Sequence, residues 1–136
     1  MPKILGLNLV AVIAASIAFF FVGFLWYGVL FSDIWMAAEG ISAEAADADN
    51  PVWMLGGFVI TVLQVIGLGL VLKWKGDATP QAAATTALVL WFFIALPFCH
   101  YTYLYTPGHN ATLLMIDASH LLVGWGVSAI VLRLIK

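Results

Sequence analysis

Charge is the scarcest property of this sequence. Its 136 residues include five Lys or Arg and seven Asp or Glu, so charged residues make up 9% of the chain, against about 25% in soluble domains. So few charges cannot cover the surface of a soluble protein of this length. The absence of any basic cluster argues against nucleic acid as a partner. The single cysteine, Cys99, excludes an intrachain disulfide, and no cysteine spacing typical of a zinc site is present.

Apolar residues take the place of the missing charges and make up 64% of the chain. A membrane-spanning helix needs about 20 mainly apolar residues, because the hydrocarbon core is about 30 Å thick and each helical residue rises about 1.5 Å. Four stretches meet this length, so the sequence predicts an all-α, integral membrane four-helix bundle that forms one domain over residues 1–136. The predicted spans cover approximately residues 5–31, 52–72, 81–103 and 112–132, and the outer loop covers residues 32–51.

Capping and turn residues mark the ends of these spans. Asn50 and Thr79 each precede a proline, which places a capping side chain next to a proline at the first helical position. The third and fourth spans are separated by a Thr-Pro-Gly-His-Asn turn, after which Asn110 or Thr112 can cap the fourth helix. Pro97, inside the third span, removes one backbone hydrogen bond and predicts a kink there.

The charges divide between the two sides of the predicted spans. All basic residues fall on one side, and they are Lys3, Lys73, Lys75, Arg133 and Lys136. The first loop carries acidic residues only, and they are Asp33, Glu39, Glu44, Asp47 and Asp49. By the positive-inside rule, we expect both termini in the cytoplasm. Within the acidic loop, Ser32 is expected to cap a short helix that ends at Gly40.

Small residues at helical spacing predict where the helices meet. Lipid supplies no hydrophobic force for helix association, so close backbone approach at small residues becomes important. The candidate packing residues are Ala11, Ala15, Gly57, Gly124 and Ser128. Contacts within one bundle are the favoured interpretation, because four helices already need such contacts. Contacts between subunits are the alternative.

Ionisable residues inside the predicted spans are the best candidates for function. Asp117 and His120 stand three residues apart on the fourth helix, which places them on one face. His100 lies at a similar depth on the third helix, and the short connection between these helices leads us to expect it near Asp117. Gln64 lies deeper, on the second helix. The candidate ligand or proton site therefore comprises His100, Asp117, His120 and Gln64.

Several interpretations of this polar cluster stay open. A carboxylate within lipid costs about 3 kcal/mol or more unless it is paired, neutral or hydrated. A structural contact between helices is favoured, and a proton, ion or small-ligand site comes next. A metal site from His100, His109, Asp117 and His120 and a catalytic Asp–His pair are less favoured, because the spacing is unspecific and no nucleophile is recognisable. We therefore expect no metal, no cofactor and no enzymatic activity.

Two stretches resemble a known family. The run Gly23–Phe31, followed by Trp35 and Met36, and the later run Ile-Asp-Ala-Ser-His-Leu at 116–121 are similar to the opening and final spans of the bacterial membrane family called domain of unknown function 1761. The resemblance covers essentially the whole chain. It implies a small four-span protein of the bacterial inner membrane, and it carries over no catalytic residue.

These features lead to two hypotheses about function. The favoured one is a non-enzymatic structural or accessory module that self-associates into a homo-oligomer or joins a larger membrane complex, with the lipid bilayer as a partner and no nucleic acid. The alternative is a small carrier, channel or ligand- or proton-binding protein whose polar site lies at His100, Asp117 and His120.

Overall fold

The computed structural model describes residues 2–40 and 51–135 of the chain. A short hairpin comes first, with β1 (Lys3–Ile4) antiparallel to β2 (Leu7–Asn8). The other described elements are helices: α1 (Leu9–Gly23), η1 (Phe24–Leu30), α2 (Ser32–Glu39), α4 (Pro51–Lys75), α5 (Pro80–Leu90), η2 (Trp91–Ala95), α6 (Leu96–Tyr105) and α7 (Ala111–Leu134). The predicted all-α class is therefore confirmed. Glu44, Asp47 and Asp49, which belong to the predicted outer loop, lie outside the described residues.

Four helical segments are long and apolar enough to cross a membrane, which confirms the four predicted spans. These segments are Leu9–Leu30, Pro51–Lys75, Pro80–Tyr105 and Ala111–Leu134. The first combines α1 with η1, and the third combines α5, η2 and α6. The last three extend slightly beyond the predicted limits, because their capping residues lie outside the purely apolar stretches.

The first span begins later than predicted, because the chain before it folds into the hairpin. The backbone reverses at Leu5 and Gly6, which both have positive φ angles, 51° and 80°. This conformation is rare for leucine and ordinary for glycine. Asn8 then accepts hydrogen bonds from the backbone N–H groups of Val10 and Ala11 and so begins α1. Uncharged residues alone did not distinguish this turn from helix.

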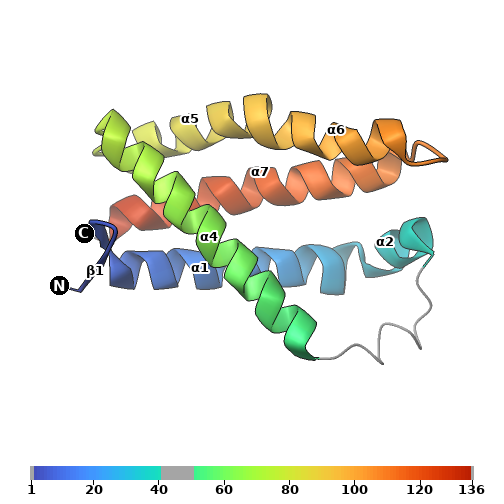
Figure 1. The fold of residues 1–136 in the computed structure, drawn as a ribbon, viewed down its shortest axis with the longest axis horizontal. Coiled ribbons are helices and arrows are strands. Elements are labelled where there is room, and N and C mark those ends of the chain that lie inside the picture. The colour runs from blue at the N-terminus through green and yellow to red at the C-terminus, as the bar shows by residue number, and fades with distance from the viewer. Residues whose placement is uncertain (1, 41–50, 136) are drawn as a thin grey trace.

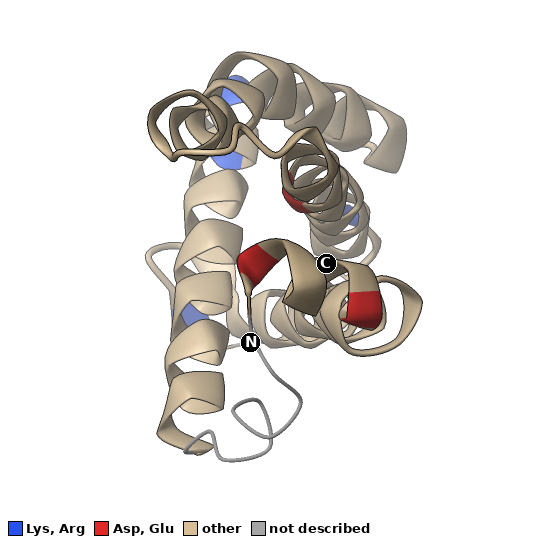
Figure 2. Cartoon of the chain, turned by 90° about the vertical axis from the view of Figure 1, so that its right-hand side faces the viewer, with Lys and Arg blue, Asp and Glu red and all other residues tan. Residues whose placement is uncertain are grey.

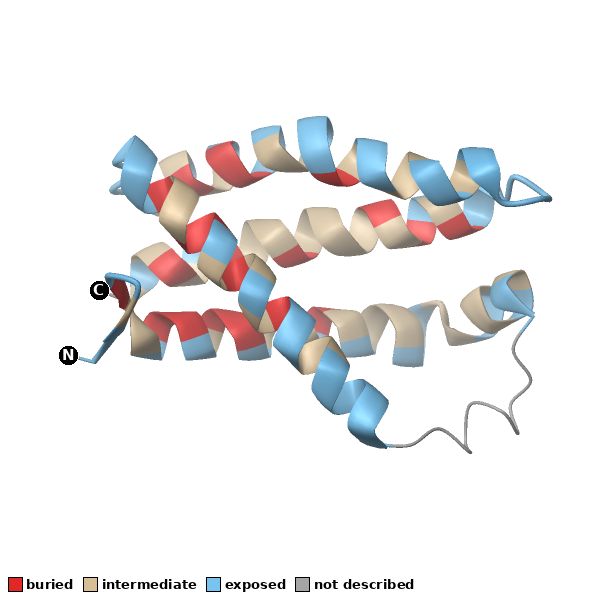
Figure 3. Cartoon of the chain, viewed as in Figure 1, coloured by how far each residue is buried: buried red, intermediate tan, exposed pale blue. Residues whose placement is uncertain are grey.

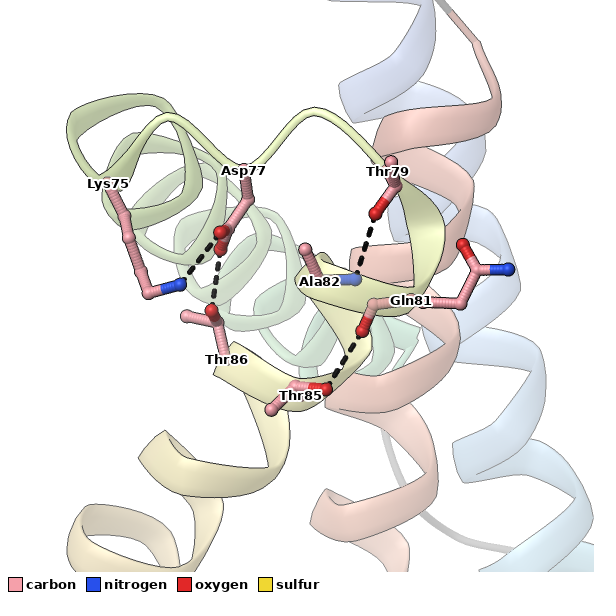
Figure 4. Close-up of polar contacts among 7 residues, drawn as sticks. All are labelled: Lys75, Asp77, Thr79, Gln81, Ala82, Thr85 and Thr86. Carbon is pink, nitrogen blue, oxygen red and sulfur yellow. Dashed lines mark hydrogen bonds and ion pairs between the residues drawn. The ribbon is translucent and has the colours of Figure 1, made fainter.

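Side-chain caps position the other helices. Thr79 accepts a hydrogen bond from the Ala82 N–H at 3.1 Å and begins α5 ahead of a proline (Figure 4). Asn110 accepts one from the Leu113 N–H at 3.0 Å and begins α7. Both caps were predicted. The short helix predicted after the first span is α2, in which Ser32 is the first helical residue rather than the cap.

Two spans contain a turn of π-helix, in which the backbone bonds span five residues instead of four. In η2, the Leu96 N–H bonds to the carbonyl of Trp91, directly before Pro97. A proline has no N–H to donate, and a local change of bonding pattern accommodates that loss within a continuous span. The other π-segment, η1, ends the first span beside α2.

The helices form a bundle in which α7 is central. Figure 1 shows α1 and the pair α5–α6 running along opposite sides of α7, and α4 crossing them obliquely. The buried residues of α4 are Thr61, Val65, Leu68, Gly69 and Leu72. All of them lie from Thr61 onward, and the part of α4 before Thr61, its first part, is largely exposed (Figure 3). As a result, α4 diverges from the other helices toward its N-terminus.

Small residues allow close packing between α1 and α7. Ala11 and Ala15 of α1 are buried, as are Gly124 and Ser128 of α7. A Cβ atom added at Gly124 would overlap the ring of Phe19, the largest fully buried side chain. Four of the five candidate packing residues therefore lie in contacts within the chain. The fifth, Gly57, is only partly buried.

The two ends of the bundle differ in charge. Both termini and the turn between α4 and α5 lie at one end, and α2 and the turn between α6 and α7 lie at the other (Figure 1). The described basic residues belong to β1 and to the last turns of α4 and α7. Figure 2 views the molecule from the α2 end and shows acidic segments on the nearer helices, with basic segments behind them.

Candidate functional site

A hydrogen bond between two spans forms the centre of the candidate site. The hydroxyl of Tyr27, in η1, donates to Oδ1 of Asp117, in α7, at 2.5 Å. Both side chains are partly buried. Hydrogen bonds from donors to a carboxylate are the ordinary means of keeping such a group within a span. The bond therefore links the two helices, and within residues 2–40 and 51–135 it is the hydrogen bond found at this carboxylate.

Aromatic rings surround this bond. The ring of Tyr27 makes edge-to-face contacts with His120, at a centroid distance of 5.0 Å, and with Trp35 of α2, at 5.3 Å. The His120 ring also lies 5.5 Å from that of Phe19. Among the described residues, His120 makes ring contacts and no hydrogen bond. Tyr27 thus brings η1, α2 and α7 together around one carboxylate and one imidazole.

The π-helical geometry of η1 positions two consecutive side chains on the same neighbour. Trp26 donates from Nε1 to the hydroxyl of Ser119 at 2.9 Å, and the next residue, Tyr27, donates to Asp117. In a regular α-helix, consecutive side chains point about 100° apart. The wider π-turn reduces this divergence, which allows both side chains to reach α7. Such segments occur frequently at functional sites.

The structure brings together only some of the predicted site residues. Asp117 and His120 share one face of α7, as their spacing predicted, and they meet Tyr27. The hydrogen-bonding contact of His100 is within its own helix, where its Nδ1 lies 2.7 Å from the carbonyl oxygen of Leu96. Gln64 lies elsewhere and accepts a hydrogen bond at 2.9 Å from Trp125.

The predicted metal candidates are also dispersed. His109 Nδ1 lies 2.8 Å from the backbone oxygen of Tyr103, in the turn before α7. Over residues 2–40 and 51–135, no group of three or more His, Cys, Asp or Glu side chains is arranged to hold a metal ion.

A large open groove lies beside the Tyr27–Asp117 bond. It has a volume of about 770 Å³ and separates the first part of α4 from η1, α2 and α7. We call it the aromatic groove. Its apolar lining includes Phe20, Phe24, Trp35, Trp53 and Met54, and its polar lining includes Tyr27, Glu39, Asp117 and His120. The divergence of α4 therefore exposes the polar cluster along one side of the bundle.

A second cavity reaches the same carboxylate from the α2 end. It has a volume of about 420 Å³ and lies between α2, α6 and α7. We call it the polar cavity, since Cys99, Thr102 and Asn110 contribute to its lining. Glu39 and Asp117 line both this cavity and the aromatic groove. Asp117 therefore stands at the boundary between the two spaces.

The charge of both spaces has one sign. Among the residues that the structure describes, their lining contains two carboxyl side chains, Glu39 and Asp117, and no Lys or Arg. Carboxylates in a low-dielectric groove attract cations, and the faces of aromatic rings add to that attraction. The arrangement is therefore suited to a positively charged molecule with an apolar body.

Two residues of this site were not predicted. Tyr27 was placed in the first predicted span and Glu39 in the acidic first loop, and neither was among the predicted site residues. The occurrence of Tyr27 inside the run Gly23–Phe31 was the available signal. Its partner on α7 could not be identified, because the contact depends on how η1 turns.

Comparison with known proteins gives a family and no closer relative. Residues 10–133 match the family described as "Protein of unknown function (DUF1761)", and the chain belongs to this family. The match confirms the resemblance seen around Tyr27 and Asp117. No curated protein and no solved structure matches the chain.

Proposed function

We propose that this membrane protein binds a lipophilic cation in the aromatic groove, with Asp117 as the counter-ion. The observation that supports this most strongly is the position of Asp117. One of its oxygens accepts the Tyr27 hydrogen bond, and the side chain lines both the polar cavity and the aromatic groove.

The carboxylate supplies the charge recognition. A carboxylate inside a span is destabilised by about 3 kcal/mol or more unless it has partners. Tyr27 provides one hydrogen bond but no positive charge. A bound cation would neutralise the group, and Glu39, which lines both spaces as well, adds a second negative side chain at their α2 end.

The groove walls supply the recognition of an apolar body. Its volume of about 770 Å³ falls within the range of about 300–1,000 Å³ that is usual for small-molecule sites. Trp35 and Trp53 flank it from opposite helices, and indole faces are the best side-chain partners for organic cations. The groove is open along the bundle, so a ligand dissolved in the membrane can enter from the side.

We also propose that the protein resides in the bacterial inner membrane with both termini in the cytoplasm. The five basic residues all lie on the terminal side of the predicted spans, and this bias is the usual determinant of orientation. The Asp117 end then faces the periplasm, and the polar cavity would admit ligand from that side.

A binding titration tests the proposed function. The full chain, in nanodiscs of zwitterionic lipid, is titrated with tetraphenylphosphonium and with the uncharged triphenylphosphine oxide. We expect binding of the cation only. Asp117→Asn should weaken it at least about tenfold, because a contact with a charged group is lost. Asp33→Asn is the matched control, since Asp33 is an exposed acidic residue of α2 that lines neither space.

Circular dichroism checks that Asp117→Asn is folded, and Glu39→Gln provides a second variant at an exposed position. Glu39→Gln should weaken binding less than Asp117→Asn does. Equal affinity of the wild-type and Asp117→Asn chains, or equal binding of the charged and uncharged probes, would contradict the proposal.

A second candidate function is self-association through the exposed face of α4, as a structural module. The observation that favours it is the exposed face containing Gly56 and Gly67, where an added Cβ would meet nothing within 4 Å. Such positions let a second helix approach closely. We propose a second copy of this chain as the occupant. Light scattering after gentle extraction should give a dimer or larger assembly, and a monomer at all concentrations would exclude this role.

A further inference from the structure

A third cavity lies at the opposite end of the bundle from Asp117. It has a volume of about 440 Å³ and lies where the hairpin meets the last turns of α4 and α7. We call it the basic cavity. Residues that line it include Gly6, Leu7, Leu72, Lys73, Leu132 and Arg133. The cavity thus combines apolar walls with two cationic side chains from different helices.

The hairpin packs beside the first of these cations, the ammonium group of Lys73. The backbone at Gly6 has a φ angle of 80°, and a Cβ atom added there would overlap Nζ of Lys73. The turn therefore packs directly against the ammonium group. The positive φ angle of Gly6 is a backbone conformation that favours glycine over larger residues at this turn.

The second cation is only partly satisfied. Nε of Arg133 is buried and has no hydrogen-bond partner among the described residues. Buried N–H groups of this kind normally have an acceptor, and those that lack one call for an explanation. Arg133 itself lines the basic cavity, so its side chain is one of the two cations that a ligand there would meet.

The carboxylate that lines this cavity is already occupied. Asp77 accepts a hydrogen bond from Nζ of Lys75 at 2.8 Å through Oδ1 and another from the Thr86 hydroxyl at 2.5 Å through Oδ2 (Figure 4). The Lys75 ammonium, more than the Thr86 hydroxyl, lowers the pKa of Asp77, and Arg133 contributes a smaller effect of the same sign. Asp77 therefore remains ionised and is neutralised by Lys75, which leaves Lys73 and Arg133 as excess positive charge.

We propose that the basic cavity binds a phosphate group, with Lys73 and Arg133 as its ligands. The guanidinium of an arginine matches phosphate oxygens geometrically, and a lysine adds a point charge. The site lies at the ends of two spans, where the headgroups of membrane lipids are found, and Leu7, Leu72 and Leu132 offer apolar surface beside it. The phosphate can belong to a lipid headgroup or be free in solution, and this site does not depend on the proposed cation binding.

Native mass spectrometry of the detergent-solubilised full chain tests the proposal. Phosphatidylglycerol is the lipid probe, phosphatidylcholine its zwitterionic comparison, and inorganic phosphate the soluble competitor. We expect saturable binding of phosphatidylglycerol. Lys73→Gln and Arg133→Gln should each weaken it about tenfold, because each removes a charge-assisted contact. Lys3→Gln is the matched control, since Lys3 is a basic residue at the same end that does not line the cavity.

The outcomes distinguish the two sources. Loss of binding in both cavity variants but not in Lys3→Gln, without competition by phosphate, supports a lipid headgroup. The same pattern with competition by phosphate supports a free anion. The proposal is overturned if the cavity variants bind like wild type, or if Lys3→Gln loses as much affinity as they do. Lys73→Gln alters an exposed residue, so it keeps the test valid if Arg133→Gln unfolds.

Discussion

Two aspartates at opposite ends of the bundle occupy contrasting surroundings. Asp77 lies in the turn after α4 and is bonded by both a cation and a hydroxyl, from Lys75 and Thr86. Asp117 lies within the fourth span and has a hydroxyl partner, Tyr27, but no cationic partner in the described part of the chain. Asp77 links the turn after α4 to α5 through Thr86. Asp117 instead lines the polar cavity and the aromatic groove.

The contrast shows how to separate a structural carboxylate from a binding one. The local partners of Asp77 already balance its charge, so it has no further need of a ligand. The surroundings of Asp117 leave its negative charge unbalanced inside a membrane span, where an unbalanced charge is destabilising. Asp117 is incompletely paired and lies beside an accessible cavity. This is why we propose Asp117, and not Asp77, as the carboxylate that binds a ligand.

The largest effect is expected from a substitution that disrupts the packing of α1 against α7, the helix that carries Asp117. Gly124→Val should destabilise the protein by about 1–3 kcal/mol, because the added side chain overpacks a filled core contact. The Phe19 ring would have to move, and α1 and α7 would separate. Thermal unfolding in detergent measures the change. Gly126→Val is the control on the same helix, because an added Cβ there meets nothing within 4 Å. Similar melting temperatures for the two variants would contradict the packing described for α1 and α7.

A smaller effect is expected from removing the hydroxyl that holds Asp117. Tyr27→Phe should lower stability by about 1 kcal/mol, the usual range for one polar contact between spans. It should also alter tetraphenylphosphonium affinity, since Asp117 loses the group that orients it. The matched variant Tyr105→Phe changes an exposed tyrosine for which the described contacts include only a ring interaction. Unchanged stability and affinity in Tyr27→Phe would show that the hydrogen bond has no role.

The smallest effect concerns the pH dependence that Asp77 contributes. Its pKa is lower in the folded protein, mainly because of Lys75. Its stabilising contribution is therefore fully present above the unfolded pKa of about 4 and is lost as the pH falls through the folded value. Melting temperatures of wild type and Asp77→Asn should converge below about pH 4. A constant difference between them at all pH values would refute this assignment.

The sequence allowed good prediction of the features that depend on local pattern. Span number follows from the length of the apolar stretches, and Thr79 and Asn110 cap helices through contacts three residues away. Asp117 and His120 share a face because three residues make nearly one helical turn. Each of these properties is contained within a few consecutive residues.

Other features depend on contacts between distant residues and were missed. Tyr27 reaches Asp117 across 90 positions through a π-segment whose bonding pattern the composition does not reveal. Two-residue strands are too short to show a periodicity, so the hairpin was read as helix. The hairpin also contributes Gly6, Leu7 and Asn8 to the lining of the basic cavity, which was not predicted.

The most direct test of the contrast compares the two aspartates in one assay. Tetraphenylphosphonium affinity is measured by calorimetry for the wild-type chain, Asp117→Asn and Asp77→Asn under identical conditions. We predict that Asp117→Asn weakens binding at least about tenfold, while Asp77→Asn lowers thermal stability and leaves affinity close to that of wild type. Equal affinities in all three chains, or an equal loss in both variants, would contradict the assignment of Asp117 as the binding carboxylate.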